Sequence, residues 1–93
     1  MNAFEQYVAH ASAADLTDKT VFSDAVREGL ELTGMSLREA ADTFKTAPGT
    51  VSRWENGHCA PPMVARIAII GIFLSRARRI AARLERETLA AAG

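Results

Sequence analysis

Residues 36–57 of this chain, SLREAADTFKTAPGTVSRWENG, contain the signals for two short helices joined by a tight turn. Ser36 and Glu39 have the spacing of a capping box, in which each side chain satisfies an unpaired backbone N–H at the start of a helix. The apolar residues of this first helix recur at helical spacing and predict one narrow buried face: Leu37, Ala40, Ala41 and Phe44.

The second helix of this stretch is predicted to begin at Pro48, because the first helical position needs no N–H donor. It is predicted to end at Asn56 and Gly57, where glycine can adopt the left-handed conformation of a helix cap. Its expected buried residues are Ala47, Val51 and Trp54, the last interpreted as a core residue rather than a stacking platform for bases. Two helices with small buried faces around a short turn describe a helix-turn-helix.

This segment resembles the helix-turn-helix of the Cro/Xre-type family, which are phage-repressor-like bacterial transcription regulators. The resemblance covers residues 36–57, extends more weakly upstream to about Phe22, and ends after Pro62. The matching positions include the small residue at the contact between the two helices and a set in the second helix: Ala41, Val51, Ser52, Trp54, Glu55 and Gly57.

Three positions depart from the pattern of that family. Leu37 stands where a glutamine usually contacts a phosphate, and Lys45 stands where the turn usually has glycine. Leu30 occupies the position of an arginine that often pairs with the acidic residue found here as Glu55. Arg27, one helical turn earlier, is the candidate to replace that arginine.

The resemblance implies that the helix at about 48–56 enters the major groove of double-stranded DNA, which is wide enough for one helix. Arg53 is the first candidate for a base contact, since its guanidinium can pair bidentately with guanine; a solvated arginine is the alternative. The other candidates for base contacts are Thr50, Gly49, Ser52 and Pro48. The candidates for phosphate contacts, which position a protein without specifying sequence, are Arg38, Lys45, Thr46, Asn56 and His58.

The whole chain of 93 residues is expected to form one domain. We expect an all-α fold, a small helical bundle that contains the helix-turn-helix, with an extra N-terminal helix and a long C-terminal helix. Residues 1–21 supply the N-terminal helix and a connector, with an apolar face of Phe4, Tyr7, Val8 and Ala11. Residues 22–57 supply a supporting helix, predicted to start with Ser23 as N-cap and to end at Gly34, and the helix-turn-helix.

Residues 61–90 have helical apolar spacing throughout, and Gly71 leaves open whether they form one helix or two. The apolar sector consists of Met63, Ile70, Phe73, Leu74, Ala77, Ile80, Ala81 and Leu84. Its second half has heptad-like spacing, which predicts either a helix that closes the core or a homodimer contact through Phe73, Ala77, Ile80 and Leu84.

The charges of the chain are unevenly distributed. Net charge is zero, but residues 1–35 hold six acids against two bases and residues 36–93 hold nine bases against five acids. Four arginines lie on one helical strip about 80° wide beside the apolar sector: Arg76, Arg79, Arg83 and Arg86. A solvated polar face is one interpretation and a phosphate-binding strip another; the interpretation we favour pairs the strip with the acidic segment 15–31 of a second chain.

Other features argue against an enzyme, a metal site and a membrane protein. Cys59 is the one cysteine, which excludes an internal disulfide and fits a reducing cytoplasm. No second pair of ligands accompanies His58 and Cys59 to complete a zinc site. The longest apolar run, 67–74, is far shorter than the ~20 residues of a membrane helix, and no signal peptide is visible. We therefore expect a cytoplasmic protein with no catalytic residue, metal, cofactor or small-molecule ligand.

Two functions remain open at this point. The first is sequence-specific binding of double-stranded DNA by a small bacterial or phage transcription regulator that pairs as a homodimer. The alternative is a protein-interaction module of the same fold, antitoxin-like or antiactivator-like, with weak or no DNA binding. Leu37, the small residues Pro48 and Gly49, and the zero net charge favour the alternative.

Overall fold

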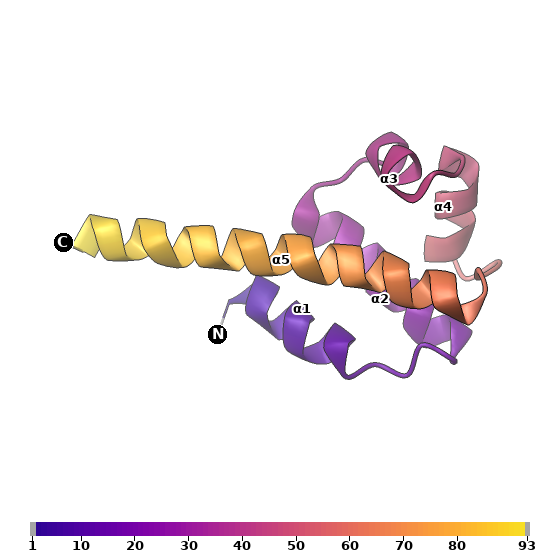
Figure 1. Ribbon diagram of the computed structural model, residues 1–93, viewed down its shortest axis with the longest axis horizontal. Helices are drawn as coiled ribbons and strands as arrows, with labels where there is room; N and C mark the ends of the chain where they lie inside the picture. Colours follow the sequence, from indigo (N-terminus) through magenta and orange to yellow (C-terminus); the bar gives the residue numbers. More distant parts are fainter. Residues whose placement is uncertain (1, 93) are drawn as a thin grey trace.

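Five helices make up the part of the chain that the computed structural model describes, residues 2–92 (Figure 1). They are α1 (Ala3–Ser12), α2 (Lys19–Thr33), α3 (Leu37–Phe44), α4 (Pro48–Glu55) and α5 (Met63–Ala92). No strand occurs within residues 2–92, which confirms the expected all-α class. α1 and α2 pack against α5, and α3 and α4 lie together at one corner of the molecule (Figure 1).

α1 begins with a capping box of its own. The Asn2 side chain accepts a hydrogen bond from the Glu5 amide at 2.8 Å, and the Glu5 carboxylate accepts one from the Asn2 amide at 3.4 Å. The predicted apolar face buries Tyr7 and Ala11. The Tyr7 hydroxyl donates to the Ala25 carbonyl of α2 at 2.8 Å, so its polar end is satisfied in the core. Burial raises the pKa of Tyr7 well above its usual range, and the nearby Glu28 carboxylate adds to the effect.

α2 begins one turn earlier than the sequence predicted. Its N-cap is Asp18 and not Ser23: the Asp18 carboxylate accepts from the amides of Thr20 and Val21 at 2.8 and 3.3 Å. Either side chain can cap a helix; in the structure Asp18 does so, and residues 19–22 form the first turn of α2. Ser23 therefore lies inside α2, where it is buried. The C-terminal end is as predicted, at Gly34 with a φ of 69°.

Arg66 connects the start of α5 to the connector between α1 and α2. Its Nε donates to the Pro61 carbonyl at 2.7 Å, and its Nη1 donates to the Leu16 carbonyl at 2.9 Å. The guanidinium also lies 6.0 Å from the centroid of the Phe22 ring. These contacts fix a segment that has no helix of its own, a role that the sequence did not indicate.

α5 is one continuous helix of 30 residues with no break at Gly71. At ~1.5 Å per residue it spans about 45 Å, close to the molecule's longest dimension of 48 Å. A single glycine inside a helix costs only about 1 kcal/mol relative to alanine, less than the packing of the first half of α5 returns. Despite this length, neither α5 nor another helix among the described residues has an apolar stretch sufficient to span a bilayer.

Two of the four residues predicted for the dimer contact belong instead to the core of the single chain. Phe73 and Ala77 are fully buried against the other helices. They are therefore unavailable to a second chain. Ile80 is half-buried, and Leu84 is 38% exposed beyond the end of the core.

Gly29 lies where α2 packs closely against Tyr7 of α1 and Phe73 of α5. A Cβ atom at this position would lie 2.7 Å from the Phe73 ring and 2.8 Å from the Tyr7 hydroxyl oxygen. Both side chains are buried, so neither can swing away. A larger residue at position 29 would force the three helices apart.

Replacing Gly29 with alanine should lower the free energy of unfolding by ~1–3 kcal/mol through overpacking. Gly71→Ala is the matched control, because it makes the same change in the interior of an exposed helix face with no atom within 4 Å. The control should be more stable than the parent by up to about 1 kcal/mol. Urea unfolding followed by circular dichroism measures both, and equal stabilities of the two variants would refute the close contact.

Candidate nucleic-acid interface

α3 and α4 are joined by residues 45–47, as the sequence predicted. The Ser36 hydroxyl oxygen accepts from the Glu39 amide at 3.1 Å at the start of α3, and Pro48 is the first residue of α4. Ala40 and Ala41 are buried where the helices meet. Gly57 has a φ of 77° just after α4, so the predicted stop is also present.

The turn between the two helices contains a strained residue. Lys45 has φ 56° and ψ 51°, and it is the one non-glycine residue with positive φ among residues 2–92. The amide of the next residue, Thr46, donates to the Ala41 carbonyl at 2.9 Å and closes the turn on α3. The left-handed conformation disfavours a side chain, because its Cβ lies too close to the backbone.

Trp54 attaches α4 to the rest of the molecule. Its ring contacts Phe22 of α2 at a centroid distance of 6.3 Å and Phe44 of α3 at 6.2 Å. Phe44 in turn contacts Phe73 of α5 at 5.4 Å, edge to face. Trp54 is 6% exposed, which confirms it as a core residue. Ala47, by contrast, was wrongly expected to be buried: it caps α4 from outside the helix and is exposed.

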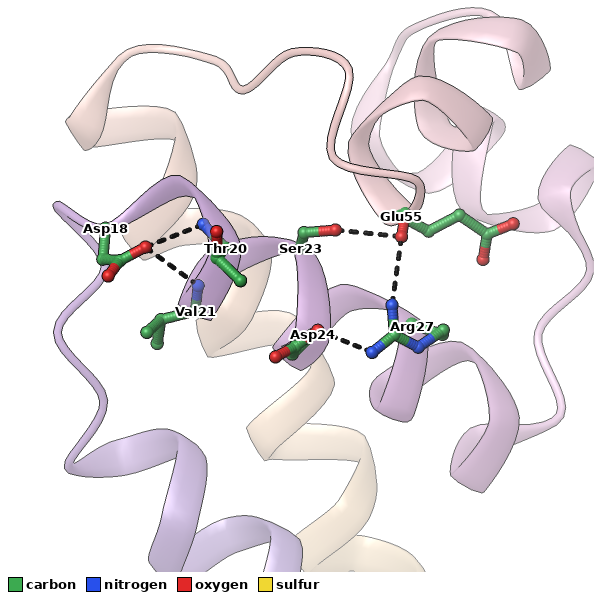
Figure 2. A network of polar contacts seen from close by, with 7 residues as sticks. All are labelled: Asp18, Thr20, Val21, Ser23, Asp24, Arg27 and Glu55. Carbon is green, nitrogen blue, oxygen red and sulfur yellow. Dashed lines mark hydrogen bonds and ion pairs between the residues drawn. The ribbon is translucent and has the colours of Figure 1, made fainter.

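The C-terminal end of α4 is held by α2 through one carbonyl group (Figure 2). The Ser23 hydroxyl donates to the Glu55 carbonyl at 2.9 Å, and Arg27 Nη1 donates to it at 3.4 Å. Arg27 also forms an ion pair with Asp24. A cation at this end of a helix is favourable, because the unpaired carbonyls there carry partial negative charge. We call this set the Glu55 carbonyl contact.

Arg27 thus contacts Glu55, as expected, but not through the carboxylate of that residue. It donates to the main-chain carbonyl of Glu55, while the Glu55 carboxylate extends away from it (Figure 2). Ser23 was missed, because it lies 32 residues from Glu55 in the chain and a serine within a helix has no local signal for such a contact.

The predicted base-contact residues of α4 are exposed or half-buried. Arg53 is exposed, and its Nη2 donates to the Thr50 hydroxyl oxygen at 3.2 Å. A Cβ at Gly49 would lie 3.8 Å from Arg53 Nη1, so the guanidinium lies close to the glycine backbone. Pro48 is exposed at the start of the helix. Ser52 is half-buried, and its carbonyl accepts a hydrogen bond from the Asn56 side chain at 2.8 Å.

The predicted phosphate-contact residues are accessible to solvent to different degrees. Four of them are exposed: Arg38, Lys45, Asn56 and His58. The fifth, Thr46, is half-buried. They come from the first turn of α3, the turn before α4 and the segment after it, and α3 and α4 lie together at one corner of the molecule (Figure 1). We call the exposed residues of α4 and these phosphate-contact candidates the α4 face.

Within residues 2–92, no group of three or more histidine, cysteine, aspartate or glutamate residues is placed to hold a metal ion. Comparison of the chain with protein-family models, with curated proteins and with solved structures gave no match.

Replacing Lys45 with glycine should raise the free energy of unfolding by ~0.5–1 kcal/mol, because glycine adopts positive φ without steric cost. Lys45→Ala is the control: it removes the same charge and keeps the strain, so its stability should match that of the parent. Chemical unfolding measures both. If the glycine variant is no more stable than the alanine variant, the positive φ at position 45 does not destabilise the protein.

Removing the Ser23 hydroxyl should destabilise the protein by ~1 kcal/mol, because the part-buried Glu55 carbonyl loses its shorter donor. Ser75→Ala, the same change at an exposed position of α5, should leave stability unchanged or slightly higher. Thermal unfolding measures the melting temperatures of the two variants. Equal melting temperatures would mean that the hydrogen bond from Ser23 to the Glu55 carbonyl does not stabilise the protein.

Proposed function

We propose that this protein binds double-stranded DNA in a sequence-specific manner and acts as a small transcription regulator, with α4 in the major groove. The observation that carries the proposal is that one side of α4 is packed into the core while the other side is exposed to solvent. Val51 and Trp54 are buried on one side, while Gly49 and Arg53 are accessible on the other. A helix used for base recognition needs this combination, because its side chains must reach base edges from a rigid support.

Arg53 is the residue proposed to specify sequence. Its guanidinium is exposed and has one side-chain acceptor on the same face, Thr50. The bond to Thr50 orients the side chain along α4, and guanine O6 and N7 would offer it a bidentate alternative. Gly49, beside the guanidinium, allows close approach of the backbone to the DNA.

The electrostatic part of DNA binding is expected to be small. Three cationic residues, Arg38, Lys45 and Arg53, belong to the α4 face, and α3 and α4 also carry Glu39, Asp42 and Glu55. If all three cations neutralise phosphates, log K should fall with log salt with a slope of about −3 per chain. Specific contacts must then supply most of the affinity.

Replacing Arg53 with alanine should weaken binding to the cognate site by ~1–3 kcal/mol and change binding to random DNA little. Arg38→Ala is the control, since loss of a phosphate contact should weaken both nearly equally. Fluorescence anisotropy on a duplex selected from a random library, and on the DNA upstream of the protein's own gene, makes the comparison. Equal losses on cognate and random DNA for the Arg53 variant would reduce it to a phosphate contact.

A protein-interaction module is the second candidate, and Leu37 is the observation that favours it. This side chain is half-buried against the core at the position where the resembling family has a phosphate-contacting glutamine. A purified protein that shifts no DNA fragment at low salt would support this candidate over the first. Either role would be carried out in the cytoplasm without metal or cofactor, which agrees with the single free Cys59.

A further inference from the structure

A shallow hollow of about 260 Å³ lies where the C-terminal end of α2 passes α5 (Figure 1). Its lining residues are Thr33 of α2 and, from α5, Arg76, Arg79, Ile80 and Arg83. We call this set the arginine hollow, because three of the five residues are arginines and none of the five is acidic. Its volume is several times the about 30 Å³ that a water molecule occupies in the liquid, so a small ligand has room there.

The guanidinium groups of the arginine hollow have no partner within the described part of the chain. No hydrogen bond or ion pair joins Arg76, Arg79 or Arg83 to another described residue. Arg66 provides a comparison, because it is half-buried like Arg76 but donates to the carbonyls of Pro61 and Leu16. A polar group that loses water without gaining a hydrogen-bond partner costs free energy. An acceptor from outside the chain would recover that cost at Arg76.

The nearby carboxylates lie outside the arginine hollow. Glu87 is one helical turn beyond Arg83 and forms no ion pair with it within 4.0 Å. Glu85 lines a separate hollow beside α1, and Glu31 lines another between α1 and α2. Residues 76–84 hold four arginines and no acid, so like charges stand three and four positions apart on one helix, where they repel each other. A bound anion would reduce that repulsion.

We propose that the arginine hollow binds the terminal phosphate or diphosphate group of a small molecule. Arg76, Arg79 and Arg83 supply three planar guanidinium groups, each able to pair bidentately with phosphate oxygens. A terminal phosphate group offers three acceptor oxygens and up to two negative charges, which suits three cationic donors. A carboxylate or a phosphodiester of DNA carries one charge and two such oxygens, so it satisfies fewer of these donors.

Thr33 shapes the arginine hollow without adding a donor. Its hydroxyl donates to the Gly29 carbonyl within α2 at 2.7 Å, so its proton is already used inside the protein. Binding of the phosphate group therefore depends on the arginines, and these are the residues to change in a test.

The arginine hollow is separate from the α4 face. None of its lining residues belongs to α3 or α4, and residues 76–83 lie farther toward the C-terminal end of α5 than the part beside α4 (Figure 1). The proposal therefore does not rest on DNA binding, and it can be tested in the absence of DNA.

Nuclear magnetic resonance of the arginine side chains gives the first test. Pyrophosphate is added to the full chain at constant ionic strength, and the Nε–H signals of the arginines are followed. The signals of Arg76, Arg79 and Arg83 should move together and saturate with one ligand per chain, at a dissociation constant below about 1 mM. The signal of Arg53, on the α4 face, should not move.

Two double variants give the second test. The hollow variant carries Arg79→Gln and Arg83→Gln, and the control variant carries Arg78→Gln and Arg86→Gln, which remove the same charge from the same helix outside the hollow. All four residues are exposed, so both variants should fold, which circular dichroism verifies. Isothermal titration calorimetry with pyrophosphate should show at least about tenfold weaker binding for the hollow variant and unchanged binding for the control.

Three results would overturn the proposal. The first is the absence of saturable pyrophosphate binding below about 1 mM. The second is an equal loss of binding in the two double variants, which would reduce the effect to the general positive charge of α5. The third is a movement of the three arginine signals with a DNA duplex but not with pyrophosphate, which would assign the arginine hollow to the DNA backbone.

Discussion

The packing of Trp54 between Phe22 and Phe44 is the contact on which the rest of the α4 face depends. α4 has eight residues, and a helix of that length is not stable in water by itself. Aromatic rings supply a large buried area and prefer tilted or edge-to-face arrangements, as at this site. Phe44 extends the contact to Phe73 on α5, so four of the five helices meet through one row of rings.

The Glu55 carbonyl contact complements this packing by fixing the far end of α4. Trp54 determines which side of α4 faces the core, and the donors Ser23 and Arg27 determine where its last turn lies. Directed hydrogen bonds define position more narrowly than apolar packing does, because they depend on angle as well as distance. The position of α4, and with it that of the exposed Arg53, thus depends on residues of α2 that contact the end of the helix.

The sequence by itself determined the helical class and most of the helix boundaries. Gly34, Pro48 and Gly57 lie where they were predicted, because each restricts or frees the backbone through its own covalent structure. The buried side of α4 was also predictable, since Trp54 and Val51 repeat at helical spacing. These are local properties, and they need no knowledge of the neighbouring helices.

Only the tertiary structure decided the rest. The start of α2 was misplaced, because Asp18 and Ser23 are both competent caps and distant contacts select between them. Gly71 did not break α5, since the packing of its first half outweighs one flexible residue. Phe73 was predicted either to close the core or to contact a second chain, because periodicity marks an apolar face without identifying what covers it. The partner of Ser23 lies 32 residues away, a distance over which pairing depends on how whole helices pack and not on any local pattern.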